Sequence, residues 1–519
     1  MYTHITKHIA LIISIIIISA GCNQNSGKYQ SSQKTDAVKI GNRGILHKPV
    51  ETIEETSVPC EKEKTRKEIA ERMDKLDMLY SARTVIDKDP SMLEIPEQLK
   101  QHFGKEFTVA ETPPEIEFVI VPVEPRFLTV YNNQEVSGWW GNYCQSNYYA
   151  PAGKFYSAVA DHGTYDAHIY LVEYDSAART IRCIPEVNKS LGKKREQFGD
   201  GILHGWFDIY QSRHLSRPHL WFCTYWSKFP EPEAADYATG YDGGHIISYD
   251  MKTGDYVDYG APLPRTSWPY HRVDTKRGIM YAVSLFGEFL AWDINEQKTI
   301  WAGYLPGNMK WYTRAILLDE TTGFVYTTDA DESDTKRHII KYDPFKNRFF
   351  KLECYMPQNT LTGQHDPMRA QTRHRGPDGL IWGVTNSGEL FAFDPDNEKV
   401  TGRGINWPGD QRYTCCLERS PGGRYIYYQV QSYTAGAPVI QYDTKTGIRK
   451  VLAFTLPYYY DRYGYIPTGS YSLKLDDKGE KLFMLWNGAF TEYKDDLGVG
   501  RWGHCSVMVM NIPEKERGE

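Results

Sequence analysis

Basic residues are not in excess in this chain. Lys and Arg number 60 against 66 Asp and Glu, which gives a formal net charge of −6 over 519 residues. Proteins that bind nucleic acid through its phosphates normally carry a basic excess or a basic stripe. The charge balance therefore excludes nucleic acid as an expected partner.

Cysteine is scarce, and its spacing is irregular. The 9 cysteines form neither the paired CxxC motifs of a zinc-binding module nor the dense framework of a small disulfide-rich protein. An oxidising compartment permits a few disulfide bridges, but the sequence does not identify the pairs. With 41% hydrophobic residues the chain is also neither disordered nor collagen-like.

Long hydrophobic runs are absent beyond the N-terminus. The aliphatic run Ile9–Ile18 follows Lys7 and leads into Ser19-Ala20-Gly21-Cys22. It spans about 10 to 12 residues, whereas a membrane-spanning helix needs about 20. We therefore expect residues 1–21 to be a signal peptide with a lipoprotein box and Cys22 to carry the lipid anchor. Ser19 departs from the usual leucine of that box, and a plain secretory signal is the alternative.

This reading predicts an exported lipoprotein of the outer membrane that faces the periplasm or the cell surface. The lipid would be the only membrane contact. Residues 22–60 are polar and predict a flexible tether, and residues 61–117 predict a helical arm. The arm prediction rests on apolar residues at helical spacing within residues 61–85, which are Ile69, Met73, Leu76 and Leu79.

Glycine (43), tyrosine (38) and tryptophan (13) are plentiful, and they favour short strands, turns and aromatic-lined surfaces. From about residue 118, an alternating strand repeatedly ends in an aromatic residue followed by aspartate and a polar turn. The copies are Tyr174-Asp175, Tyr249-Asp250, Trp292-Asp293, Tyr342-Asp343, Phe393-Asp394 and Tyr442-Asp443, with a degenerate one at Val509-Met510-Asn511. The four central intervals are 43, 50, 51 and 49 residues.

Four-stranded units that repeat at this period are blades of a β-propeller. The sequence predicts an all-β, monomeric protein with a seven-bladed propeller over residues 118–513. An early strand near Phe118–Val123 would close the ring. Alternating strands and the length of the unit disfavour helical-pair repeats and a long parallel β-helix.

In a propeller, the loops that enter the innermost strands and the loops that follow the second strands open on one face. Arginine binds carboxylate or sulfate with two parallel hydrogen bonds, and aromatic faces stack on sugar rings. The residues expected on that face therefore predict an anionic carbohydrate ligand, although single residues among them would equally satisfy backbone groups around the channel. They are His162, His204, Trp206, Tyr225, Trp226, Lys228, His271, Arg272, Trp311, Tyr312, Arg314, His365, Arg369, Arg373 and His374.

The repeat also sorts the histidines. His245 and His338 each begin the motif His-Ile-Ile-x-Tyr-Asp, and His168 opens a similar strand, which favours a structural role for all three. His162 has no equivalent in the other blades, and His204 lies on the same expected face. These two are the better candidates for proton transfer.

The blade pattern together with His162, His204, Tyr225 and the channel arginines resembles the seven-bladed propeller lyases of uronic-acid polysaccharides, ulvan lyases in particular. The segment Arg419–Tyr428 is also similar to blades of oligogalacturonate-lyase-type propellers. The resemblance implies β-elimination, in which His162, His204 and Tyr225 exchange protons at C5 and C4 of a uronate. The cations and aromatic faces that would bind the substrate are Arg272, Arg314, Arg373, Trp226 and Trp311.

The resemblance leaves two reactions open. If C4 of the uronate bears another sugar, the chain is cleaved and the enzyme is a lyase. If C4 bears a hydroxyl group, water leaves and the enzyme is an oligosaccharide dehydratase. No cofactor is required for this chemistry, but relatives carry a structural zinc, for which His271, His374 and Cys416 are the candidate ligands.

Two other function classes remain. A surface lipoprotein could bind glycans or a protein through the same face without catalysis, since propellers serve both purposes. A glycoside hydrolase would need paired carboxylates on the channel face, and its candidates Asp161, Asp208 and Asp366 are scattered among the blades.

Overall fold

The chain divides into two units, Met1–Glu71 and Arg72–Glu519, and all the residues described below belong to the second. The predicted signal peptide, Cys22, the tether, residues 61–83 of the predicted helix and Trp311 lie outside the described residues. The computed structural model describes residues 84–123, 129–131, 134–136, 139–162, 167–193, 198–226, 232, 234–284, 286–306, 314–329, 335–408, 412–431, 436–490 and 504–518.

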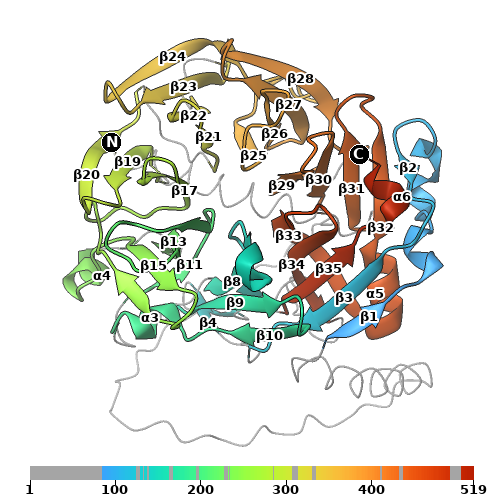
Figure 1. Cartoon of the computed structure of the whole chain (residues 1–519), viewed down its shortest axis with the longest axis horizontal. Helices are drawn as coiled ribbons and strands as arrows, with labels where there is room; N and C mark the ends of the chain where they lie inside the picture. The colour runs from blue at the N-terminus through green and yellow to red at the C-terminus, as the bar shows by residue number, and fades with distance from the viewer. Residues whose placement is uncertain are drawn as a thin grey trace, which may run out of the picture. The chain divides into compact units, whose positions relative to one another are not determined.

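Seven sheets of four or five strands, antiparallel except for one short edge strand, stand around a common centre, with one strand of each sheet innermost (Figure 1). This confirms the predicted all-β, seven-bladed propeller. Blade 1 comprises β6 (Trp139–Gly141), β7 (Asn147–Tyr149), β8 (Lys154–His162), β9 (Ile169–Asp175) and β10 (Thr180–Cys183). Blade 2 comprises β12 (Asp208–Tyr210), β13 (His219–Cys223), β15 (Ile246–Asp250) and β16 (Tyr256–Asp258).

The next four blades follow the same order from the centre outwards. Blade 3 comprises β17 (Tyr270–Asp274), β18 (Ile279–Val283), β19 (Glu288–Asp293) and β20 (Lys298–Tyr304), and blade 4 comprises β21 (Leu317–Asp319), β22 (Phe324–Thr328), β23 (His338–Asp343) and β24 (Arg348–Tyr355). Blade 5 comprises β25 (Met368–Gln371), β26 (Ile381–Thr385), β27 (Glu389–Asp394) and β28 (Lys399–Ile405), and blade 6 comprises β29 (Leu417–Arg419), β30 (Tyr425–Gln429), β31 (Pro438–Asp443) and β32 (Arg449–Phe454).

Blade 7 is built from both ends of the propeller sequence. It contains β33 (Tyr465–Leu475), β34 (Lys481–Phe490) and β35 (Ser506–Asn511), and β3 (Glu115–Ile120) pairs antiparallel with β35. Phe118 lies opposite Met508 in that register. The predicted closing strand is thus present, and it begins at Glu115. Closure of the ring removes the open edge that an incomplete last sheet would leave.

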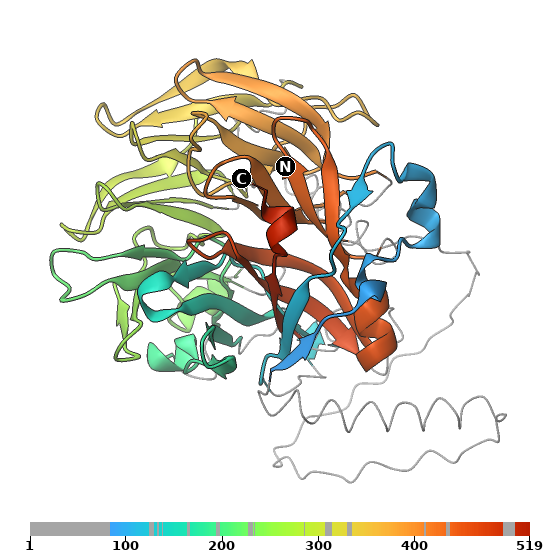
Figure 2. The ribbon, with the colours of Figure 1, turned by 45° about the vertical axis from the view of Figure 1, so that its right-hand side comes forward.

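The segment before β3 runs along blades 7 and 6 as short elements (Figure 2). β1 (Val85–Asp87) pairs with β3, and β2 (Thr108–Val109) pairs in parallel with β32. Two 3₁₀ helices, Pro90–Leu93 and Glu97–His102, lie between them. Asp87 is buried and accepts hydrogen bonds from Tyr458 and Tyr463 of α5 (Thr455–Tyr463), at 3.0 Å each from Oδ1.

The repeated aromatic–aspartate pair ends the third strand of each of the first six blades. The aspartate shapes the turn to the fourth strand: Asp250 Oδ1 accepts from the backbone N–H groups of Lys252 and Thr253, at 2.8 and 3.2 Å. The aromatic ring packs between blades, as where Tyr342 of blade 4 lies 5.0 Å from Phe289 of blade 3. The signature therefore combines an Asx turn with a contact between blades.

The remaining elements lie outside the seven sheets. β4 (Thr129–Tyr131) pairs with β5 (Gln134–Val136), β11 (Asp200–Ile202) pairs with β14 (Tyr225–Trp226), and the short helices are α3 (Val187–Ser190), α4 (Ala234–Ala238) and α6 (Glu514–Arg517). Across the described ranges, no helix is long and apolar enough to cross a bilayer. The cysteines that the structure describes are all free thiols.

Candidate functional site

Five residues from five blades meet near the channel, four of them at or just before the start of an inner strand and one within an inner strand. Antiparallel blades bring the starts of all inner strands to one face of a propeller, so side chains placed there converge. We call this group the upper-channel cluster. It consists of His204 before β12, Arg314 before β21, Arg369 in β25, Tyr413 before β29 and Tyr471 in β33.

Two guanidinium groups of this cluster share one phenolic oxygen. Nη1 of Arg314 donates to the hydroxyl oxygen of Tyr413 at 2.9 Å, and Nε of Arg369 donates to the same oxygen at 2.7 Å. The guanidinium of Arg369 also lies 5.0 Å from the ring centroid of Tyr413 and 5.3 Å from that of Tyr471. Two positive charges are therefore held side by side, an arrangement that attracts an anion.

Aromatic rings form the other side of the cluster. The ring of Tyr471 lies 5.7 Å from that of His204 and 5.2 Å from that of Tyr143, and the His204 and Tyr143 rings are stacked at 6.0 Å. Burial raises the pKa of Tyr471 well above its ordinary value, and Arg369 and Arg314 offset only part of this effect. Tyr471 is thus a neutral phenol at physiological pH.

The five residues of the cluster differ in how deeply they are buried. Arg369, His204 and Tyr471 are 0%, 4% and 5% exposed, whereas Arg314 and Tyr413 are half-buried. Arg314 and Tyr413 are therefore the members of the cluster with the most contact with solvent.

Arg272 and Arg373 form a separate network with Asp208. Arg373 pairs with one oxygen of Asp208 and donates to the carbonyl oxygens of Ser146 and Phe207 at 2.8 and 3.1 Å. Nε of Arg272 lies 3.5 Å from the other oxygen of Asp208, and Nη2 donates to the carbonyl of Arg373 at 3.0 Å. These contacts tie the inner strands of blades 2, 3 and 5 to one another and to blade 1.

Both of these guanidiniums also lie against the ring of Trp206, at 4.9 Å for Arg272 and 4.4 Å for Arg373. Arg272 is fully buried, and Arg373 is 5% exposed. The contacts described for both arginines are made with Asp208, backbone carbonyl groups and Trp206. Their predicted role in substrate binding stays a prediction.

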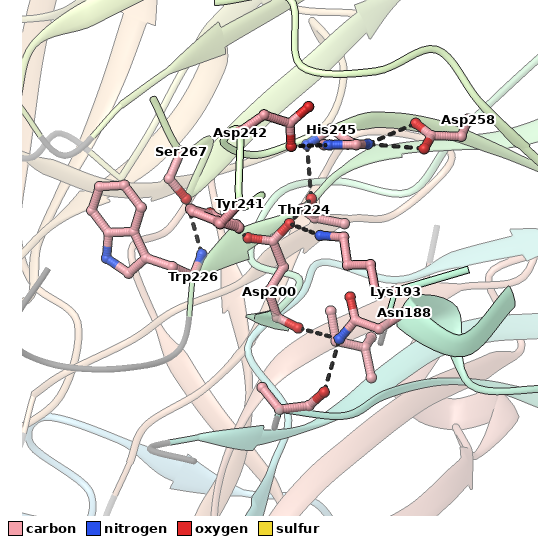
Figure 3. Close-up of polar contacts among 12 residues, drawn as sticks. Asn188, Lys193, Asp200, Thr224, Trp226, Tyr241, Asp242, His245, Asp258 and Ser267 are labelled. Atoms are coloured by element: carbon pink, nitrogen blue, oxygen red, sulfur yellow. Dashed lines mark hydrogen bonds and ion pairs between the residues drawn. The ribbon is translucent and has the colours of Figure 1, made fainter. Parts of the chain in front are cut away.

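Tyr225 and Trp226 form β14 and are buried in an apolar cluster with Phe198, Ile202 and Tyr241. The backbone N–H of Trp226 donates to Oγ of Ser267 at 2.9 Å (Figure 3). With 3% and 2% exposure, the two rings offer little surface for stacking on a sugar. Their predicted roles in catalysis and binding stay predictions.

A buried carboxylate supports this pair of strands. Asp200 of β11 is fully buried and accepts from Oγ1 of Thr224 at 2.6 Å, the hydroxyl of Tyr241 at 2.7 Å and Nζ of Lys193 at 3.2 Å (Figure 3). Nδ2 of Asn188 donates to the backbone carbonyl oxygen of Asp200 at 2.6 Å. Buried charge is tolerated only when it is paired in this way, so Asp200 fixes the position of β14.

His245 lies between two carboxylates beside Thr224 (Figure 3). Nδ1 donates to Asp258 and Nε2 donates to Asp242, each at 2.8 Å. Burial alone would lower the pKa of His245, but the hydrogen bonds to the two aspartates raise it overall. His338 likewise donates from Nδ1 to the carbonyl of Leu352 at 2.8 Å. Both histidines thus bind the fourth strand of their own blade, which accounts for their recurrence in the repeat.

His162 is the last residue of β8, where its backbone pairs with Trp139. Its side chain, like that of Asp161, lies outside the described residues, as do Trp311, Tyr312 and Lys228. The predicted roles of His162 and Trp311 therefore stay predictions.

The three candidate zinc ligands do not fit a shared metal site. Nε2 of His271 accepts from the backbone N–H of Cys223 at 3.3 Å, and burial lowers the pKa of His271 to about 4. His374 pairs with Glu320 at 3.2 Å, and Cys416 is a buried thiol 3.3 Å from the carbonyl of Ser470. Within the described ranges, no three His, Cys, Asp or Glu side chains converge as metal ligands do.

Tyr413 and Tyr471 were not among the candidates from the sequence. Tyr413 stands four residues before the first residue of its inner strand, as His204 does. Its sequence distance from the predicted strand could therefore have identified it as a candidate. Tyr471 lies within an eleven-residue strand and carries no such signal.

The chain matches no protein-family model, and a search of curated proteins finds no similar sequence.

Proposed function

We propose that the upper-channel cluster binds the carboxylate of a uronic-acid residue and that the protein catalyses β-elimination on an anionic, ulvan-like oligo- or polysaccharide. The observation that carries the proposal is the convergence of Arg314 and Arg369 on the hydroxyl of Tyr413, at 2.9 and 2.7 Å. A uronate carboxylate satisfies both cations, and the aromatic rings beside them suit a sugar ring.

Neutralising the carboxylate is the chemical requirement of this reaction. Removal of the C5 proton places negative charge on the carboxylate, and paired guanidiniums stabilise that charge as it develops. The electron pair of the C5–H bond forms the C4–C5 double bond, and the C4–O bond breaks. Tyr413 and His204 are the described groups that would exchange the two protons, with His162 as the further candidate.

The leaving group decides the product. A sugar at C4 makes the reaction a chain cleavage, and a hydroxyl at C4 makes it a dehydration. No metal or other cofactor takes part in either step as proposed.

We also propose that the protein acts as an exported, monomeric lipoprotein anchored through Cys22, with an outer-membrane location that faces the periplasm or the cell surface.

The test is incubation with a panel of uronate polymers and saturated uronate oligosaccharides. We expect ultraviolet absorbance from an unsaturated uronate, and mass spectrometry of the products to separate the two reactions. Loss of one water without shortening identifies a dehydratase, and shortened unsaturated products identify a lyase.

A pair of matched variants connects the activity to the cluster. Tyr413→Phe should lower turnover about 10²-fold or more, the usual cost of losing a proton-transfer group. Tyr304→Phe, at a tyrosine of blade 3 that is 68% exposed, should leave turnover unchanged. Binding of uronate glycans without any unsaturated product would refute the elimination proposal in favour of a non-catalytic glycan-binding propeller.

A further inference from the structure

A groove of about 520 Å³ lies away from the channel, between blades 4 and 5. Its walls come from Lys336 before β23, the end of β24, the loop that follows β24, and β28. β24 and β28 are the outermost strands of their blades and lie at the rim of the ring, whereas β25 and β29 lie at its centre (Figure 1). We call this feature the rim groove. The residues used below are Lys336, Tyr355, Gln358, His365 and Gly402.

The rim groove presents an aromatic ring beside a cation. Tyr355, the last residue of β24, is 41% exposed. Nζ of Lys336 lies 5.1 Å from its ring centroid, and the imidazole of His365 meets the ring edge-on at 5.2 Å. Lys336 and the imidazoles of His365 and His338 therefore surround part of the ring, while the rest of the residue is in contact with solvent.

Polar groups of the groove are oriented by the backbone. Nδ1 of His365 donates to the carbonyl oxygen of Met356 at 2.6 Å, so Nε2 is the ring nitrogen that would accept from a ligand hydroxyl. Gln358 is exposed, and its backbone forms a bridge with His365. These two side chains supply an acceptor and an amide next to the ring of Tyr355.

The groove carries one lysine, Lys336, on an acidic protein. The residues that line it, all within the described ranges, include no Asp or Glu. The neighbouring carboxylate of Glu398 is paired with Lys341. In a chain of net charge −6, a hollow with a lysine and no acidic side chain favours an anion.

We propose that the rim groove is a second, non-catalytic binding site for an acidic saccharide. A sugar ring stacks on Tyr355, its carboxylate or sulfate group pairs with Lys336, and its hydroxyl groups bind His365 and Gln358. The choice of ligand rests on the proposed function. The groove holds a lysine where the channel holds a pair of arginines, so it retains polymer at the surface rather than activating a C5 proton.

The test is the affinity of the full chain for polygalacturonate, measured by titration calorimetry, with neutral dextran as the comparison polymer. Tyr355→Ala and Lys336→Gln should each weaken binding of polygalacturonate about threefold to tenfold, the range expected for losing an aromatic or cationic contact at an exposed site. Tyr304→Ala, at the more exposed tyrosine of blade 3, should leave the affinity unchanged.

The same titration in an Arg314→Gln background separates this site from the channel. There, the rim groove should still bind polygalacturonate, and Tyr355→Ala should weaken the remaining binding about threefold to tenfold. This result would support the rim groove even if no uronate substrate were ever converted. Unchanged affinity in both Tyr355→Ala and Lys336→Gln, or equal affinity for dextran, would overturn the proposal and leave the channel chemistry unaffected.

Discussion

A Cβ atom placed on Gly205 would lie 2.2 Å from Nδ1 of His271, which is far inside van der Waals contact. Gly205 precedes Trp206 at the entry to blade 2, and His271 is a fully buried residue of the inner strand of blade 3. The close approach of these two blades at the channel therefore depends on the absence of a side chain at one position.

We expect Gly205→Ala to lower the free energy of unfolding by about 1 to 3 kcal/mol, because the buried imidazole has no room to move aside. Urea denaturation followed by tryptophan fluorescence measures the change. Gly199→Ala is the matched control, since its Cβ would meet its nearest atom, Nδ2 of Asn188, at 3.4 Å. Equal stability of the two variants would contradict the proposed contact.

Arg314→Gln should reduce kcat/KM on a uronate substrate about 10²- to 10³-fold, because the interaction strengthens as negative charge develops on the carboxylate. The variant should show both a lower kcat and a higher KM. Arg348→Gln, at an exposed arginine of β24, should behave as the wild type. A change in KM alone would assign Arg314 to substrate binding only.

His162→Ala should lower turnover about 10²- to 10⁴-fold while thermal stability stays near that of the wild type. The expectation follows from the absence of an equivalent histidine in the other blades and from the position of His162 at the end of β8. Steady-state rates together with a melting curve measure both quantities. Full activity of this variant would remove His162 from the mechanism.

Acidification from pH 7 to pH 5 should destabilise the fold through two buried histidines. Burial lowers the pKa of His271 and of His504 to about 4 from 6.5, so between these values the unfolded chain binds protons that the folded chain does not. Each group then costs on the order of 2 kcal/mol at pH 5, and the loss levels off below about pH 4.

His504→Gln checks this pH dependence, because it removes one of the two groups. The difference between the urea midpoints at pH 7 and pH 5 should become smaller in this variant than in the wild type. An unchanged difference would show that His504 titrates alike in the folded and unfolded states.

Cys22→Ala should release the mature protein from the membrane fraction, because acylation at this residue is the predicted anchor. Fractionation of cells followed by a high-salt wash separates an anchored protein from one that adheres by charge. Retention of the variant in the washed membranes would refute the lipoprotein prediction.

The fold was readable from the sequence because the repeated signature is local. An aspartate such as Asp250 bonds with backbone groups two and three residues further on, so each copy marks one turn without reference to the rest of the chain. Six such turns, together with the degenerate copy that ends at Asn511, mark one blade each, so the number of blades follows by counting.

The channel contacts could be predicted only in part, because their partners are distant in sequence. Arg373 donates to the carbonyl of Ser146, which is 227 residues away, and to that of Phe207, 166 residues away. Its residue type and its expected place in a loop next to an inner strand predicted a position at the channel, but not these partners; in the structure Arg373 follows the end of β25. The same holds for Tyr413, whose two arginines come from other blades.

The pairing of β3 with β35 also sets the order in which the protein is completed. Nδ2 of Asn511 donates to the carbonyl of Glu115 across 396 residues of chain, so the final sheet forms only after nearly the whole sequence has emerged. Contacts this distant make folding slow, because the entropy of closing the loop must be overcome first. In a chain exported from its N-terminus, the ring would therefore still be open during passage across the membrane. β3 would cross before β35, the strand with which it pairs.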